Sequence, residues 1–339
     1  MNMKAILLDK SGTPDVLKIS DIPEPAPAAG EVLVKLHYSG INYAEILSRK
    51  GLYGWAVERP YVLGMEGAGI IEAAGEGVDA SRVGETVMIG TQYGCYAEKI
   101  ALPENRAIPA ISHYSMEENA AFAVNFMTAW VSLFKMAKMQ PEDRVLITAA
   151  AGGVGTAAIQ LAAKLGCEVY GMAGNPEKID LVTSLGAAGA VNYRDENWAE
   201  KIESAGGGFD VVLEMVGGDI FKKSYDLLNP FGRMMIAGFA SFNLKKWNPF
   251  SWYKTWRDMP KFDIRSMAIK SVAVMGSHLG YLLDKPDVMQ AMFDDLKAFV
   301  VQHDIKPVIG KVFPFEAAAE AHQFIESRKS VGKILLKHE

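Results

Sequence analysis

The chain has 339 residues, of which 50% are hydrophobic and 22% charged, so it is expected to form about two globular domains and not a disordered chain. The formal net charge of −5 argues against bulk binding to nucleic acid, because a negatively charged protein repels a polyanion. Only two cysteines are present, Cys95 and Cys167, which excludes a disulfide scaffold and a zinc lobe held by four thiolates.

Residues 1 to about 105 contain short apolar runs between clusters of Gly, Pro and Asp. These runs are KAILL, GEVLVKLHYS, GAGIIEAAG, GETVMIG and CYAEKIAL. Short strands bounded by turn residues are typical of a β-rich barrel or sandwich. The proline-rich run DIPEPAPAAG, residues 21–30, predicts an extended and exposed loop without regular structure.

From about residue 120 the pattern changes to a long helix followed by strands and helices in alternation. The expected strands are RVLIT, CEVYGM, AAGAVNY, FDVVLEMVG and GRMMIAGF, and the helices between them cover 153–165, 176–185, 197–204 and 219–228. This alternation is what a parallel sheet with right-handed crossovers requires. After about 280 we expect two further helices, and a last strand, GKILLK, that returns to the first domain.

A glycine-rich turn, AAAGGVG at 149–155, lies between the strand RVLIT and the helix 153–165. In that context the backbone N–H groups of a turn and a helix N-terminus can bind a pyrophosphate. The spacing is a variant of G-x-G-x-x-G, with alanine at the first position. The sequence therefore predicts a dinucleotide site, and the candidate binding residues are Ala151, Gly152, Gly153, Val154 and Gly155.

The end of the second strand of this domain indicates which dinucleotide is bound. A site that prefers NAD carries an acid there to hold the ribose 2′-hydroxyl, and residues 169–176 contain none. Asn175 and Lys178 lie there instead, and the third strand ends in Tyr193 and Arg194. These side chains suit an adenosine 2′-phosphate, so the sequence favours NADPH.

The motifs AAAGGVG, GINYAEILSRKGLY, GMEGAGIIEAAGEGV, VNFMTAW and SVGKILL resemble those of the zinc-independent medium-chain dehydrogenase/reductases. The likeness is greatest to quinone oxidoreductases of the ζ-crystallin type, and VNFMTAW, HLGYL and DIKPVIG look most like the vesicle amine transport protein branch. The resemblance implies an α/β protein with a GroES-like β-rich catalytic domain (1–124 and 281–339). It also implies a Rossmann doubly wound parallel-sheet domain that binds NADPH (125–280), and a homodimer through the last Rossmann strand, for which KSVAVMGSH is the candidate.

The zinc-dependent relatives hold their metal at three places that align with Asn42, Met65 and Val124 in this sequence. None of these residues is a zinc ligand of the usual nitrogen or sulfur kind, so we expect no metal. Without a Lewis acid, hydride addition to a quinone or an α,β-unsaturated carbonyl is the favoured chemistry, because the charge is delocalised onto a remote oxygen.

The resemblance also implies roles for individual residues. Asn42 and Tyr53 would lie over the nicotinamide, and Tyr53 matches the tyrosine proposed as proton donor in enoyl reductase relatives, although it could instead only orient the acceptor. Thr128, Phe239 and Arg328 match positions that contact the cofactor in the family.

The segment 241–270 contains seven basic and two acidic residues, together with Trp247, Trp252 and Trp256. Such a strip could make a peripheral membrane contact or admit an apolar substrate, or it could be a lid packed on its own domain.

Two rival functions remain beside the NADPH-dependent quinone reductase. One is an enoyl-thioester reductase, and the other is an NADPH-binding, membrane-associated protein with little catalysis. The N-terminus has no basic head followed by an apolar stretch, so we expect no export signal and a cytoplasmic location.

Overall fold

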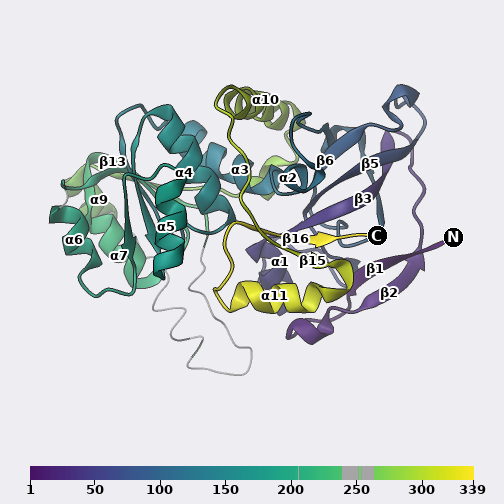
Figure 1. Cartoon of the computed structure of the whole chain (residues 1–339), viewed down its shortest axis with the longest axis horizontal. Helices are drawn as coiled ribbons and strands as arrows, with labels where there is room; N and C mark the ends of the chain where they lie inside the picture. Colours follow the sequence, from purple (N-terminus) through teal and green to yellow (C-terminus); the bar gives the residue numbers. More distant parts are fainter. Residues whose placement is uncertain (205, 239–250, 252, 254–262) are drawn as a thin grey trace. The chain divides into compact units, whose positions relative to one another are not determined.

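The computed structural model describes residues 1–204, 206–238, 251, 253 and 263–339 (Figure 1). Its chain divides into two compact units. The first unit comprises Met1–Asn125, Gly280–Lys297 and Lys306–Glu339, and the second comprises Phe126–Leu279 and Ala298–Ile305. The sequence prediction gave all of 281–339 to the first domain, whereas the structure groups Ala298–Ile305 with the second unit.

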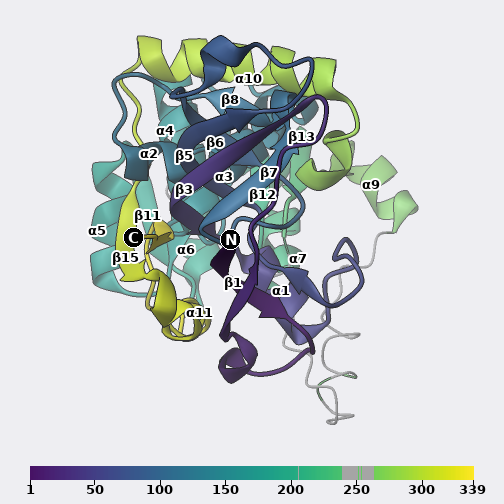
Figure 2. The same cartoon turned by 90° about the vertical axis from the view of Figure 1, so that its right-hand side faces the viewer.

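The first unit is built mainly from two sheets. A three-stranded sheet has the order β2-β1-β4, and a seven-stranded sheet has the order β15-β16-β3-β5-β6-β8, with β7 pairing to β3. Strands β3, β5 and β6 of the larger sheet are labelled in Figure 2. The strands are β1 (Asn2–Leu8), β2 (Ile19–Pro23), β3 (Glu31–Ile41), β4 (Tyr61–Val62), β5 (Glu66–Ala74), β6 (Thr86–Gly90), β7 (Lys99–Pro103), β8 (Ala107–Pro109), β15 (Ile309–Pro314) and β16 (Lys333–Lys337). The helices that begin in this unit are α1 (Tyr43–Lys50), α2 (Met116–Ala120), α3 (Ala123–Trp130), α10 (Pro286–Gln302) and α11 (Ala318–Glu326). The expected β-rich first domain is confirmed.

One local prediction in this unit is wrong in part. The run at 21–30 was expected to lack regular structure, but its first three residues belong to β2, which pairs antiparallel with β1. Pro23 is compatible with a strand because β2 is at the edge of its sheet, where a missing N–H breaks no ladder.

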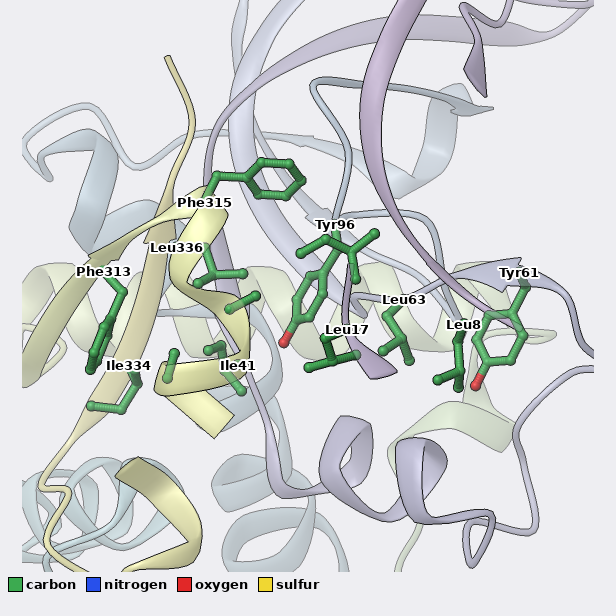
Figure 3. Packing of buried hydrophobic residues seen from close by; sticks show 13 residues of the cluster. Leu8, Leu17, Ile41, Tyr61, Leu63, Tyr96, Phe313, Phe315, Ile334 and Leu336 are labelled. Atoms are coloured by element: carbon green, nitrogen blue, oxygen red, sulfur yellow. The ribbon is translucent and has the colours of Figure 1, made fainter. Parts of the chain in front are cut away.

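The last strand does return to the first unit, as expected. β16 pairs antiparallel with β3, and Ile334 lies opposite Ile41. Both isoleucines belong to a buried apolar cluster that also contains Leu336, Phe313 and Phe315 (Figure 3). Because the strands run in opposite directions, the residue before Ile334 and the residue after Ile41 face each other.

The second unit contains a six-stranded sheet with the order β11-β10-β9-β12-β13-β14. All its strands are parallel, so the predicted fold class is confirmed. The strands are β9 (Arg144–Ile147), β10 (Glu168–Ala173), β11 (Gly189–Asn192), β12 (Phe209–Glu214), β13 (Leu228–Ile236) and β14 (Ala273–Gly276). The helices are α4 (Gly153–Leu165), α5 (Pro176–Ser184), α6 (Trp198–Ser204), α7 (Gly218–Asp226) and α9 (Ile264–Lys270).

The strand order of this sheet reverses between β9 and β12. In open sheets of this kind, ligands bind outside the carboxyl ends of the strands at the point of reversal. The glycine-rich turn follows β9 directly, and it therefore lies at the place where the topology predicts a ligand.

Candidate functional site

The turn at 149–155 brings α4 into very close contact with the backbone that precedes it. A Cβ on Gly155 would lie 2.5 Å from the carbonyl oxygen of Ala149 and 2.6 Å from that of Ala150, so only glycine fits there. Gly152 is the N-cap of α4, and the helix begins at Gly153. The N–H groups of a first helical turn have no partner inside the helix, and they point out along its axis.

These features fit a bound pyrophosphate. Ala151, within the turn, is buried, and Gly153 and Val154 supply backbone N–H groups at the helix N-terminus. The helix dipole adds positive potential at the same point.

Glu214 is a buried acid at the carboxyl end of β12, the strand that pairs with β9 at the reversal. Its side chain is 1% exposed, and Oε1 accepts hydrogen bonds from the backbone N–H groups of Val216 and Gly217. Burial raises the pKa of Glu214 to about 7. Glu214 therefore holds the loop after β12 through these hydrogen bonds, and it can take up a proton near neutral pH.

Glu214→Gln is expected to stabilise the protein at high pH. Since the folded pKa lies above the usual value of 4.5, the wild type loses stability as the pH rises from about 4.5 through about 7. Glutamine keeps the acceptor oxygen but carries no charge. Urea unfolding at pH 5 and pH 8.5 measures the effect. The unfolding free energy of the variant relative to that of the wild type should be about 2 to 3 kcal/mol higher at pH 8.5 than at pH 5.

The exposed Glu200, in α6 of the same unit, provides the control. Glu200→Gln should follow the wild-type pH dependence. A constant difference between Glu214→Gln and wild type at the two pH values would contradict the role assigned to burial.

The ends of β10 and β11 bring two positive charges close together. Burial lowers the pKa of Lys178, and the positive charge of Arg194 lowers it further. The phenol of Tyr193 lies against the backbone of Gly174, where a Cβ would be 2.7 Å from its hydroxyl oxygen. Asn175 caps α5, because its Oδ1 accepts a hydrogen bond 2.9 Å long from the backbone N of Lys178. A phosphate dianion beside Lys178 and Arg194 would relieve their mutual repulsion, so these residues fit a 2′-phosphate.

In the first unit, Asn42 is attached to a buried ion cluster formed by Lys333, Glu66 and Glu45. Lys333 Nζ donates a hydrogen bond of 2.6 Å to Asn42 Oδ1 and forms an ion pair with Glu66 Oε1. Asn42 donates from its backbone N to Glu45 Oε2 at 2.7 Å and from Nδ2 to Glu45 Oε1 at 3.3 Å. The Lys333 and Glu66 side chains are only 2% and 1% exposed, and burial raises the pKa of Glu45 to about 7.

Tyr53 is half-buried in the loop after α1, with its ring packed edge-on against Trp55 at 6.4 Å between centroids. Burial raises the pKa of the phenol well above its usual value, and the negative charge of Glu45 raises it further. The hydroxyl is therefore neutral at physiological pH and can donate a hydrogen bond.

The remaining predicted site residues belong to different units or lie outside the described residues. Thr128 is half-buried in α3 within the second unit, and Arg328 is exposed after α11 in the first unit. Phe239 lies outside the described residues, as do Trp247, Trp252 and Trp256 with most of segment 241–270.

Comparisons with known proteins cover almost the whole chain. Residues 28–112 match the model of the alcohol dehydrogenase GroES-like domain, and residues 153–297 match a model described as zinc-binding dehydrogenase. The human synaptic vesicle membrane protein VAT-1 homolog is 32% identical over 98% of this chain and 86% of its own length. The pig quinone oxidoreductase is 33% identical over 98% of this chain and 97% of its own length. The chain belongs to the quinone oxidoreductase family of medium-chain dehydrogenase/reductases. The predicted family is thus confirmed.

A solved structure of a family member has the same fold. The Escherichia coli quinone oxidoreductase, crystallised with NADPH, superimposes with a TM-score of 0.87 at 27% identity, over 99% of this chain and 100% of that one. No helix in the described part of the chain is long and apolar enough to cross a membrane.

Although one matching family model is described as zinc-binding, the residues of this quinone oxidoreductase family member do not fit a zinc ion. At the three aligned positions, Asn42 is bonded to an ammonium group, and Met65 and Val124 donate backbone N–H groups to Glu45 and Glu66 at 2.9 Å. The Asn42 amide oxygen is already bonded to a cation, Met65 offers only a thioether and Val124 an alkyl side chain, whereas zinc is bound by Cys thiolate, His nitrogen or Asp/Glu carboxylate. No group of three or more His, Cys, Asp or Glu side chains suited to a metal occurs among the residues that the structure describes.

The sequence analysis missed the ion cluster and Glu214. Asn42 and Glu45 have the spacing of an N-cap and its third helical residue, which is the signature of a capping box and could have drawn attention to Glu45. Glu214 ends an apolar strand at a predicted ligand-binding edge, and that position was the available signal.

Proposed function

We propose that the chain is an NADPH-dependent reductase that delivers hydride to quinones or α,β-unsaturated carbonyls without a metal. The observation that carries the proposal is the second unit's glycine turn at a topological switch point, with Lys178 in the first turn of α5 and Arg194 after β11. Membership of the quinone oxidoreductase family supports the same reading.

Each of the two units has a distinct task in the proposed reaction. The N–H groups of Gly153 and Val154 bind the pyrophosphate, and Lys178 with Tyr193 binds the 2′-phosphate. NADPH, when bound, supplies the hydride. Asn42 and Tyr53 donate hydrogen bonds to the acceptor oxygen, on which negative charge develops.

Lys178→Ala is expected to weaken NADPH binding by about 10- to 30-fold, the usual effect of losing one charged phosphate contact of roughly 1.5 to 2 kcal/mol. NADH lacks the 2′-phosphate, so its affinity should change by less than about twofold. Fluorescence titration with both coenzymes measures this. Lys164→Ala, at an exposed position of α4, is the matched control. An equal loss for NADH and NADPH would contradict the 2′-phosphate role.

Tyr53→Phe is expected to lower kcat/KM for the favoured acceptor by about 10-fold, because one hydrogen bond to the developing charge is lost. The raised pKa of the phenol makes it a weak acid, which favours hydrogen bonding over direct proton donation. Steady-state assays of wild type, Tyr53→Phe and Tyr43→Phe with a quinone, an enone and crotonyl-CoA test both the role and the acceptor class. Preference for crotonyl-CoA would identify an enoyl-thioester reductase, and no turnover of any acceptor would refute the reductase proposal.

A homodimer through β14 accompanies this proposal. β14 is the last strand of its sheet, and α9 beside it exposes Ile264 and Ile269 at 79% and 75%. An edge strand next to exposed apolar side chains suits pairing with a second copy, which light scattering of the purified chain would detect. Membrane contact through 241–270 and a cytoplasmic location stay predictions.

A further inference from the structure

We infer that Lys333 is a positioning residue that orients the amide of Asn42, leaving one Nδ2 hydrogen directed away from the ion cluster for the acceptor. The contact between Asn42 and the acceptor rests on the proposed function, whereas the orienting role of Lys333 does not.

The backbone brings the members of the cluster together from distant parts of the sequence. The pairing of Ile334 with Ile41 places Lys333 opposite Asn42, and β5 pairs with β3 so that Glu66 lies opposite Gly40. A Cβ on Gly40 would lie 2.6 Å from Lys333 Cε and 2.8 Å from Glu66 Cγ. The glycine therefore gives the lysine and glutamate side chains the space in which they meet.

The charges of the cluster allow only one orientation of the Asn42 amide. An ammonium group can only donate, so the atom that faces Lys333 must be the acceptor Oδ1. With Oδ1 facing Lys333, the donor Nδ2 faces Glu45 Oε1, which also accepts a hydrogen bond from the backbone N of Met65. Rotating the amide by 180° would place a donor against the ammonium and an acceptor against the carboxylate.

The amide orientation leaves a defined hydrogen-bonding capacity. Nδ2 carries two hydrogens, and Glu45 accepts one of them. Asn42 is partly exposed, unlike Glu45, Glu66 and Lys333, which are buried. Among these four side chains, only that of Asn42 reaches the surface of the first unit. Its second Nδ2 hydrogen is therefore the one that a bound molecule can accept.

The test removes the cation in two backgrounds. The variants are Lys333→Arg, Lys333→Met, and Lys333→Met combined with Glu66→Gln. The double substitution removes both buried charges and keeps the acceptor for the backbone N of Val124, so it guards against misfolding. Each is made in the wild type and with Asn42→Ala. Arg82→Met is the control, because Arg82 bonds Glu85 and two backbone carbonyls in the same unit without touching Asn42. Quinone turnover, NADPH affinity and a crystal structure of the Lys333→Met, Glu66→Gln protein are the measurements.

In the wild-type background, loss of Lys333 should lower kcat at least 10-fold, change the NADPH dissociation constant by less than threefold and be partly rescued by Lys333→Arg. In the Asn42→Ala background, loss of Lys333 should lower kcat by less than a further factor of two. The crystal structure should show the Asn42 side chain displaced. Equal losses in both backgrounds, or an Asn42 side chain that stays in place without the cation, would overturn the inference. If the wild type reduces no acceptor, the proposed function fails, and the crystal structure still decides the orienting role of Lys333.

Discussion

Gly155→Val is expected to abolish measurable dinucleotide binding and to destabilise the second unit. The added Cβ would lie 2.5 Å from the carbonyl oxygen of Ala149, closer than real carbon atoms approach an oxygen, so α4 must move away from the turn. That movement takes the N–H groups of the first helical turn out of the pyrophosphate site. We expect NADPH affinity to fall by about 100-fold or more, and stability by about 1–3 kcal/mol, as for other overpacked positions.

Coenzyme titration and urea unfolding measure these two effects. Gly90→Ala is the control, because no atom lies within 4 Å of the position where its Cβ would be. The Gly90 variant should bind the coenzyme as the wild type does. Normal coenzyme affinity in Gly155→Val would show that the turn is not the binding element.

Lys333→Met is expected to lower the free energy of unfolding by about 3–5 kcal/mol, the usual effect of removing one partner from a buried ion pair. The reason is that Glu66, 1% exposed, keeps its charge but loses its cation. The loss should be smaller at pH 5 than at pH 8, because burial raises the pKa of Glu45 to about 7 and this neighbouring acid is neutral at the lower pH. Chemical denaturation at both pH values is the measurement.

The matched control is Lys222→Met. Lys222 pairs with Asp219 at 3.4 Å, but the two side chains are 62% and 88% exposed, so the expected change is below about 1 kcal/mol. Equal destabilisation by the two substitutions, or no pH dependence for Lys333→Met, would contradict the account of the buried cluster.

The elements that the sequence predicted well are those encoded by neighbouring residues. The turn at 149–155 combines a strand, glycines and a helix within a short stretch, so its position and the extent of α4 could both be predicted. The same holds for the alternating strands of the second unit. The end of β2, residues 21–23, was missed because it lies in a proline-rich run, and its pairing with β1 depends on the tertiary structure.

The ion cluster could not be predicted in the same way. Lys333 and Asn42 are 291 positions apart, and a lone lysine at the start of an apolar strand gives no sign that it is buried. Glu45 lies on a short helix with Arg49 and Lys50, which by sequence looks like a solvated charged surface. Only the register of β3, β5 and β16 identifies which charges meet, and register depends on the whole fold.

The contribution of β16 to the first unit also has a consequence for biosynthesis. Glu66 and Lys333 are 267 positions apart, and the whole of the second unit is translated between them. At ribosomal rates of roughly 5–20 residues per second, about 13–50 seconds pass between the synthesis of the carboxylate and that of its cation. During that interval the nascent N-terminal sheet lacks both its closing strand and the charge that neutralises its interior. The sheet of the first unit can therefore be completed only after the second unit has been synthesised.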